Sequence, residues 1–343
     1  MEMNSKVLIL YTGGTIGMVK DLKTGRLVSF DFNHLYTHIP ELERLPITLE
    51  SISLEKPIDS SEINRSHWQN IGRIVLENYH EFDGFVILHG SDTMAFTASV
   101  LSFMVQGLNK PIILTGSQLP IGTIRTDGKE NLITAIEIAG AKDAQGISVI
   151  QEVAVYFEYS LLRGNRSSKI SANQFDAFAS PNYPKLAVAG VNIEFQNDRL
   201  FRSAKDTIQF SPELSDQLSL IKLFPGMNFN AYSSIFKLEN NRLIILETFG
   251  SGNASSDVTF RKLITQFIAE GGIVLNVTQC SSGSVQQGKY ETSSFFEAAG
   301  VISGKDLTTE AAVTKSMHLL GVYSSQETVK KFLKEDLVGE MTV

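Results

Sequence analysis

The sequence predicts an α/β protein with two α/β domains: a larger N-terminal domain on a doubly wound, mostly parallel sheet, and a smaller C-terminal domain. Two observations support this. Short apolar runs end repeatedly in turns of glycine and small hydroxyl residues, with amphipathic helical segments between them. In addition, 343 residues exceed what one ordinary core needs. We place the N-terminal domain at 1–195, a linker at 196–213 and the C-terminal domain at 214–343.

The first strand of the N-terminal domain is predicted at 7–11, where an apolar, β-branched run stops before Gly13. Further strands are expected at 48–54, 82–88, 111–115 and 149–157, helices at 66–78, 93–105 and 131–141, and a β-rich stretch at 186–195. This alternation is typical of a parallel sheet whose loops gather on one edge.

The C-terminal domain repeats the alternation on a smaller scale. Its strands are expected at 218–224, 242–248 and 272–278, and its helices at 257–270, 308–320 and 325–337. The segment at 196–213 is polar and without periodicity, as expected of a linker.

The composition excludes several classes of partner. The 30 Lys and Arg against 37 Asp and Glu give a net charge of −7, which argues against nucleic-acid and anionic-membrane binding. The N-terminal apolar run is too short to span a membrane. Cys280 is the only cysteine, so no intrachain disulfide forms and we expect a cytoplasmic protein. No His-x-x-x-His pair falls on a predicted helix and no cysteine cluster is present, so we expect no metal.

The turn at 13–15 is the first candidate site. Its two glycines let the backbone turn sharply and approach a ligand, and Thr15 follows the carboxyl end of a predicted strand. A hydroxyl held there is a candidate nucleophile, with glycine N–H groups as oxyanion donors. The alternative is a tight turn whose threonine only caps the next segment. A phosphate-binding loop is disfavoured because no lysine follows the glycines, and a self-cleaving enzyme because Thr15 is internal.

A second strand-end turn carries Ser91 and Asp92 and adds a carboxylate to the pattern. For Asp92 the alternative is a charge that complements the dipole of the next helix. Lys169 would complete a hydrogen-bonded relay, because a desolvated amine accepts a proton; the alternative is a solvated basic cluster. Ser60 and Ser61 follow the strand at 48–54, where helix capping is the alternative to ligand binding.

These segments resemble the bacterial-type L-asparaginases, in particular their cytoplasmic type I branch. The two signature motifs of that family are similar to residues 12–17 (TGGTIG) and 89–94 (HGSDTM). Further segments that resemble type I sequences lie at 59–61, 115–118, 163–169, 175–182 and 276–280. The resemblance covers nearly the whole chain, in the same order.

The resemblance implies hydrolysis of L-asparagine to L-aspartate and ammonia through a threonine nucleophile and an acyl-enzyme-type intermediate, with no cofactor and a minor glutaminase activity. Thr15 is similar to the nucleophile, and Ser91, Asp92 and Lys169 to the catalytic group beside it. The substrate-binding positions would be Gly14, Asp59, Ser60, Ser61, Ser91, Asp92 and Asn253, with the backbone N–H groups of Gly14 and Ser91 as oxyanion donors. The family also implies a homodimer or homotetramer in which Asn253 completes a neighbour's site.

Three positions depart from the family pattern. Ser91 stands where the family usually has threonine, so its rotamer is less fixed. The segment 18–30 is polar and could act as a lid, with an ordinary surface hairpin as the alternative. It lacks the usual tyrosine; Arg26 lies near that place, and Tyr290 is another candidate substitute. Some type I enzymes hold an effector asparagine with an arginine where this chain has Glu247, which puts an effector site in doubt.

Two other functions are weighed against this one. The first is the asparaginase-like subunit of a tRNA-dependent amidotransferase, disfavoured because the first strand begins near residue 6 and that subunit carries an extra N-terminal segment. The second is a non-enzymatic amino-acid-binding protein, which would bind its ligand without releasing ammonia and would not need Lys169.

Overall fold

The computed structural model describes residues 5–20, 27–29, 39–205, 207–288 and 291–343. Arg26 and Tyr290 lie outside the described residues. The chain divides into two units, residues 1–210 and 211–343. Within the described part of the chain, no helix is long and apolar enough to cross a membrane.

The first unit is built on a mixed sheet, which has eight strands within the described residues, in the order β13-β12-β9-β8-β7-β5-β1-β4. Neighbours from β4 to β8 are parallel, and those from β8 to β13 are antiparallel. The strands are β1 (Ser5–Gly13), β4 (Ile47–Ile58), β5 (Gly84–Leu88), β7 (Ile112–Thr115), β8 (Val153–Phe157), β9 (Ser160–Arg163), β12 (Ala187–Ala189) and β13 (Ile193–Phe195). The predicted α/β class is confirmed.

The strand order reverses at β1. The chain passes from β1 to β4 on one side, then crosses back over β1 to β5 on the other side. Ligands bind outside the carboxyl ends of parallel strands at such a reversal, because the loops diverge there and leave a crevice. The loops that follow β1, β4 and β5 therefore meet where a site is expected.

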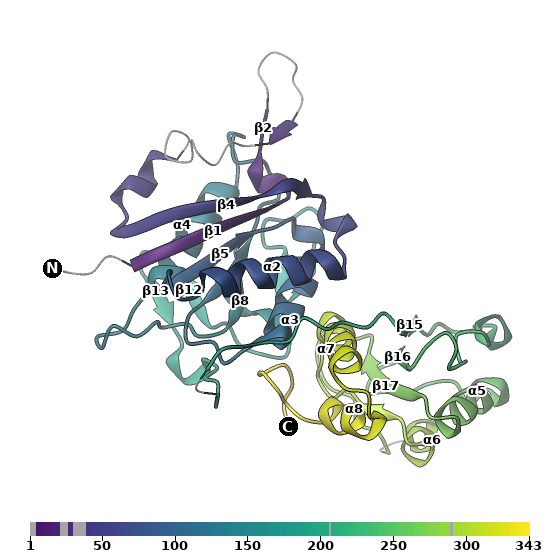
Figure 1. Ribbon diagram of the computed structural model, residues 1–343. Helices are drawn as coiled ribbons and strands as arrows, with labels where there is room; N and C mark the ends of the chain where they lie inside the picture. The colour runs from purple at the N-terminus through teal and green to yellow at the C-terminus, as the bar shows by residue number, and fades with distance from the viewer. Residues whose placement is uncertain (1–4, 21–26, 30–38, 206, 289–290) are drawn as a thin grey trace. The chain divides into compact units, whose positions relative to one another are not determined.

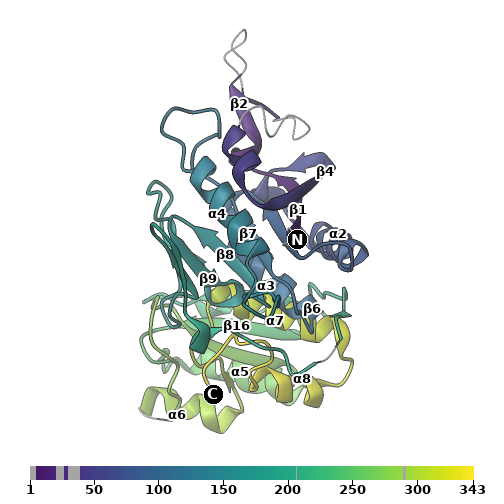
Figure 2. The same ribbon diagram turned by 90° about the vertical axis from the view of Figure 1, so that its left-hand side faces the viewer.

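Helices cover both faces of this sheet. α2 (Arg65–Asn78) and α3 (Met94–Met104) lie on one face, and α4 (Gly128–Gly140) lies on the other (Figures 1 and 2). Side chains alternate along β1, so Val7, Ile9 and Tyr11 enter the core that α4 covers. Burial of both faces explains why the β1 sequence is apolar without alternation.

The sequence misplaces the end of β4 and misses the antiparallel strand β9, whereas β12 and β13 lie in the predicted β-rich stretch at 186–195. The strand is predicted to end at residue 54, yet β4 continues to Ile58. Pro57 is tolerated because β4 is an edge strand and its register with β1 shifts between Tyr11 and Gly13. The strand β9 lies in a stretch whose sequence indicates only a basic segment, although it is fully buried.

Two short hairpins and a strand in the predicted linker complete the first unit. β2 (Met18–Lys20) pairs with β3 (Leu27–Ser29), so the described part of the predicted lid is an antiparallel hairpin. β10 (Ser168–Lys169) pairs with β11 (Phe178–Ala179). Within the predicted linker, β14 (Gln209–Phe210) pairs with β6 (Val105–Gln106), and η7 (Asn197–Arg199) forms a short 3-10 turn.

The second unit has a four-stranded parallel sheet, within the residues described, in the order β15-β16-β17-β18. These strands are β15 (Leu218–Lys222), β16 (Leu243–Thr248), β17 (Ile273–Thr278) and β18 (Ile302–Ser303). α5 (Val258–Ala269) and α6 (Glu291–Ala299) pack on one face, and α7 (Thr309–Val322) and α8 (Gln326–Leu333) on the other (Figure 1). The sequence patterns do not predict α6 and β18.

Candidate active site

A cavity of about 440 Å³ lies at the carboxyl ends of β1, β4 and β5, where the strand order reverses. Residues of the first unit line it: Gly14, Thr15, Met18, Pro57, Ile58, Asp59, Ser60, Gly90, Ser91, Asp92, Gln118, Lys169 and Ala172. The structure thus brings the four predicted catalytic residues to one cavity, from separate strand-end loops and a hairpin.

The turn after β1 places Thr15 by close backbone packing. Gly13 and Gly14 both have positive φ, at 136° and 87°. A Cβ on Gly13 would lie 2.1 Å from the carbonyl oxygen of Ile58, and one on Gly14 would lie 2.4 Å from the nitrogen of Gly90. The turn therefore rests directly on the loops after β4 and β5, which is possible only without side chains. Thr15 then begins the 3-10 turn η1 (Thr15–Gly17).

Tyr11 stabilises this turn through its contacts with Gly17. Its hydroxyl donates a hydrogen bond to the carbonyl oxygen of Gly17 at 3.2 Å, and its ring packs directly against the same glycine. Burial raises the pKa of Tyr11 to about 12, because the phenolate would lose its hydration. Tyr11 is therefore protonated at neutral pH and cannot accept a proton from Thr15.

The loop after β4 presents Asp59 and Ser60 to the cavity. The Asp59 carboxylate accepts hydrogen bonds from the backbone N–H and the hydroxyl of Ser61, both at 2.9 Å. These bonds, the backbone one first, lower the pKa of Asp59, so its carboxylate is charged at neutral pH. Ser60 is buried, whereas Ser61 is exposed and faces Asp59. Asp59 thus caps the 3-10 turn η4 (Ser60–Glu62) by accepting from Ser61, and both Asp59 and Ser60 line the cavity.

Ser91, Asp92 and Lys169 form one hydrogen-bonded group. The Lys169 amine donates to the Ser91 hydroxyl oxygen at 2.8 Å and to Asp92 Oδ1 at 2.7 Å. The Lys169 side chain is 16% exposed and that of Asp92 is 68% exposed. Lys169 is therefore not part of a solvated basic surface. It reaches the strand-end turn from the hairpin strand β10, seventy-seven positions beyond Asp92 in the chain.

His89 holds the backbone beside Ser91. It is fully buried; its Nδ1 lies 2.7 Å from the carbonyl oxygen of Gly90 and its Nε2 lies 2.9 Å from Thr97 Oγ1. A carbonyl can only accept, so Nδ1 carries the proton and Nε2 accepts from Thr97, which in turn accepts from the Trp68 indole at 2.9 Å. Burial lowers the pKa of His89 to about 4, which keeps it neutral.

Gln118 is a cavity residue that the sequence does not single out as a site residue. It follows β7, in the same strand-end position that Ser91 holds after β5. Its side-chain oxygen lies 3.3 Å from the Ser91 hydroxyl. The sequence does indicate a strand-end turn here, because β7 is followed by glycine and serine. The next residue is an uncharged amide, however, which does not by itself suggest a catalytic role.

Two predicted positions lie in the second unit. Asn253 forms backbone hydrogen bonds with Phe249 in the turn after β16, at 2.8 and 2.9 Å. Its role in a neighbour's site remains a prediction. Glu247 is a buried residue near the end of β16; its carboxylate accepts from the Thr309 hydroxyl and pairs with Lys222 at 3.2 Å.

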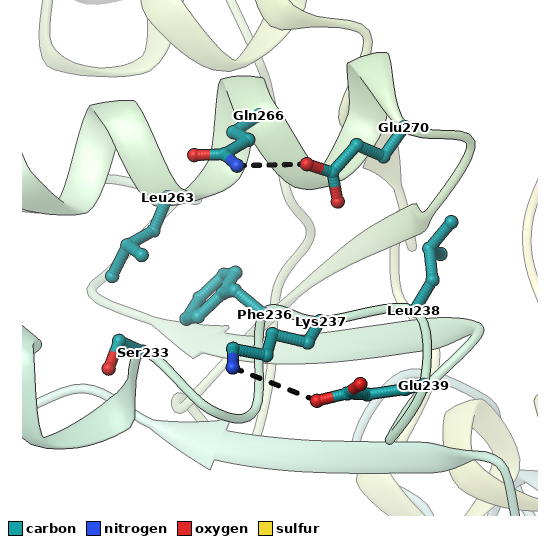
Figure 3. Close-up of a pocket in the computed structure, with 8 residues that line it drawn as sticks. All are labelled: Ser233, Phe236, Lys237, Leu238, Glu239, Leu263, Gln266 and Glu270. Carbon is teal, nitrogen blue, oxygen red and sulfur yellow. Dashed lines mark hydrogen bonds and ion pairs between the residues drawn. The ribbon is translucent and has the colours of Figure 1, made fainter.

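The second unit also has a groove of about 500 Å³ between α5 and residues 233–239, whose apolar lining is formed by Phe236, Leu238 and Leu263 (Figure 3). Its charged and amide side chains pair with each other, Lys237 with Glu239 and Gln266 with Glu270, so they do not converge on a ligand (Figure 3). Among the residues that the structure describes, no group of three or more His, Cys, Asp or Glu is placed to hold a metal ion. The cavity at β1 is therefore the candidate active site.

Comparison with known families decides the kind of enzyme. Residues 6–201 match the family model described as Asparaginase, N-terminal. Residues 217–333 match the Glutaminase/Asparaginase C-terminal domain. The chain belongs to the asparaginase family. This membership confirms the predicted resemblance and the prediction of an amidohydrolase.

Individual asparaginase-family members match along the full chain. It is 37% identical to L-asparaginase 1 of Escherichia coli strain K12, over 98% of each chain. It is similar in structure to L-asparaginase I of Vibrio cholerae, with a TM-score of 0.89 and 37% identity, covering 99% of this chain and 100% of the other. It is also 31% identical to one of the subunits of the glutamyl-tRNA(Gln) amidotransferase of Thermoplasma acidophilum, over 98% of this chain and 80% of that protein.

Proposed function

We propose that this protein is an L-asparaginase that hydrolyses L-asparagine to L-aspartate and ammonia, with Thr15 as nucleophile. One observation carries the proposal: Thr15, the Ser91–Asp92–Lys169 group and the Asp59–Ser60 turn line a single cavity at the strand reversal. Hydrolysis of an amide needs an attacking hydroxyl, a proton acceptor and donors for the oxyanion, and the residues around this cavity supply one of each.

The proposed reaction has two halves. The Thr15 hydroxyl oxygen attacks the side-chain amide carbon. Ser91 accepts the Thr15 proton and passes its own proton to Lys169, which can take it up only as the neutral amine. The oxyanion of the tetrahedral intermediate accepts hydrogen bonds from the backbone N–H groups of Gly14 and Ser91. Return of the proton to the nitrogen releases ammonia and leaves an ester on Thr15. Water then attacks the ester carbon, which releases aspartate and restores the hydroxyl.

The α-amino acid head of the substrate is proposed to bind at Asp59, Ser60 and Asp92. The carboxylates of Asp59 and Asp92 have the charge that an α-ammonium group requires, and the Ser60 hydroxyl can donate to the α-carboxylate. Ser61 acts on Asp59 rather than on the substrate, through its two hydrogen bonds to that carboxylate. The head groups fix the distance from the substrate's α-carbon to Thr15.

Ammonia release from asparagine by the purified chain tests this function. The expected result is turnover without any added cofactor or partner. The amidotransferase relative makes a tRNA-dependent amidotransferase component the second candidate, which predicts little hydrolysis of free asparagine by the isolated chain. Stoichiometric binding of asparagine without ammonia release would instead indicate a binding protein. A cytoplasmic location and a homodimer or homotetramer completed by Asn253 are further proposals from the family.

We expect the enzyme to prefer asparagine over glutamine, with only minor glutaminase activity. The head group is fixed by Ser60 and the two carboxylates, so the extra methylene of glutamine moves the amide away from Thr15. A displacement of about 1 Å can lower the rate by ~10²-fold, and we expect kcat/KM to differ by about that factor. Ammonia release measured with both amides over the same concentration range checks this. Equal kcat/KM values would contradict it.

We expect asparagine to act without cooperativity. An effector site of the family would need a cation where Glu247 stands, and a carboxylate repels the α-carboxylate of asparagine. Glu247 is moreover already bound by Lys222 and Thr309. Initial rates across a wide range of asparagine concentrations should give a Hill coefficient of about 1. A sigmoidal curve that becomes hyperbolic in Glu247→Ala would show that the site binds an effector.

A further inference from the structure

We propose that Gln118 is a positioning residue that selects the orientation of the Ser91 hydroxyl. The inference rests on the proposed function and adds a residue to it. Gln118 lines the cavity, but its amide has no acid–base chemistry of its own. It acts on the reaction through Ser91, whose hydroxyl lies 3.3 Å from the Gln118 amide oxygen.

The orientation of the Gln118 amide follows from its other partner. Its Nε2 donates to the backbone carbonyl of Gln174 at 2.9 Å. A carbonyl can only accept, so nitrogen must face Gln174 and oxygen must face Ser91. The acceptor that Gln118 offers to Ser91 is thus fixed by a backbone atom, and no side chain of the 171–177 segment is needed for it.

The Ser91 hydroxyl is then held from two sides. Its oxygen accepts from the Lys169 amine at 2.8 Å, and its proton is donated to Gln118. A hydroxyl has one proton and two lone pairs, so one lone pair stays available to the cavity. An acceptor facing the cavity is what the attacking hydroxyl of Thr15 requires. As Ser91 accepts that proton, its own proton turns from Gln118 to the neutral amine of Lys169. Without Gln118, the Ser91 proton can turn into the cavity and present a donor instead.

Serine needs this support more than threonine does. Threonine is restricted at χ1 by its methyl group, whereas serine can occupy three staggered wells. The loop that carries Gln118 is itself firmly held, because the buried carboxylate of Asp127 accepts from the backbone N–H groups of Gln118 and Leu119 at 2.8 and 3.1 Å. Gln118 can therefore restrain Ser91 from a fixed backbone, and its side chain can be changed without unfolding the loop.

A double-mutant cycle on asparagine turnover tests the proposal. Gln118→Met keeps an unbranched side chain of similar length but removes the acceptor, and should lower kcat about tenfold, as expected for one hydrogen bond, with KM within about twofold. In a Ser91→Thr background, where the methyl group restricts the rotamer, the same change should lower kcat about threefold or less. Gln174→Ala is the control, because it keeps the backbone carbonyl; it should match the wild type.

The outcomes separate this proposal from the proposed function. Lack of any amide hydrolysis by the wild type overturns the proposed function. An active wild type with an unchanged kcat in Gln118→Met overturns only the role of Gln118. An equal loss in the serine and threonine backgrounds also overturns it, since the effect would then not pass through the Ser91 rotamer. Gln118→Leu provides a second test of the same bond if the methionine variant does not fold.

Discussion

Thr15→Ala is expected to abolish asparagine turnover, with kcat lowered by on the order of 10³-fold or more, because Thr15 is the hydroxyl residue that directly follows the glycine turn of β1. Binding of asparagine should change little, since Asp59, Ser60 and Asp92 hold the head of the substrate. Steady-state ammonia release measures the first effect, and calorimetric titration of the inactive variant with asparagine measures the second.

Thr15→Ser is the matched variant, because it keeps the hydroxyl and should retain measurable turnover. Substantial activity in a folded Thr15→Ala protein would remove Thr15 from the role of nucleophile. The wild-type chain should also run as one band on a denaturing gel. Two fragments, one of them starting at an internal threonine, would favour a self-cleaving enzyme instead.

Lys169→Ala is expected to lower kcat by on the order of 10²–10⁴-fold, the usual range for loss of a general base. Its ion pair with Asp92 cannot account for such an effect through stability. Asp92 is 68% exposed, and exposed ion pairs contribute about 0–1 kcal/mol. We therefore expect a large change in kcat with a small change in the unfolding midpoint. Rates and thermal denaturation measured on the same preparation separate the two.

Lys185→Ala serves as the control, because Lys185 is an exposed lysine of the same unit that does not line the cavity. A companion variant, Arg26→Ala, should mainly raise KM, because a guanidinium stays charged above pH ~12 and cannot take up the proton from Thr15. The opposite pattern, with a mild Lys169→Ala and an Arg26→Ala that loses kcat, would assign the proton transfer to the predicted lid.

The strand-end positions could be predicted from the sequence because local patterns encode them. Thr15 and Ser91 each follow an apolar run and a glycine turn, and parallel strands bring such turns to one edge. The role of Lys169 follows from the family resemblance, since the hairpin that directs its amine to Ser91 depends on pairing with residues 178–179. The role proposed for Gln118 could not be predicted from the sequence, because it depends on a hydrogen bond to Ser91, which lies on another loop.

The antiparallel strand β9 of the first sheet could not be predicted for a similar reason. The sequence around Arg163 favours a solvated basic cluster, yet Arg163 is 5% exposed at the end of β9. It pairs with Glu152 at 2.6 Å and stacks on the ring of Tyr183. Both partners come from other elements, so the sequence around Arg163 reveals the positive charge but not the residues that pair with it. A buried charge requires such a partner, which only the tertiary structure supplies.

The glycine contacts at β1 restrict how this catalyst can be redesigned. The turn at 13–14 lies against Ile58 and Gly90 without room for a Cβ, and a Cβ on Gly90 would in turn lie 2.5 Å from the Ser60 hydroxyl. The backbones of these three loops are thus in direct contact, so a side chain added at one of the glycines would displace the neighbouring loops. New substrates have to be accommodated by changing side chains that line the cavity, such as those of Met18, Gln118 and Ala172. Substrate specificity can therefore change during evolution through these side chains, while the backbone conformation of the glycine-containing loops is retained.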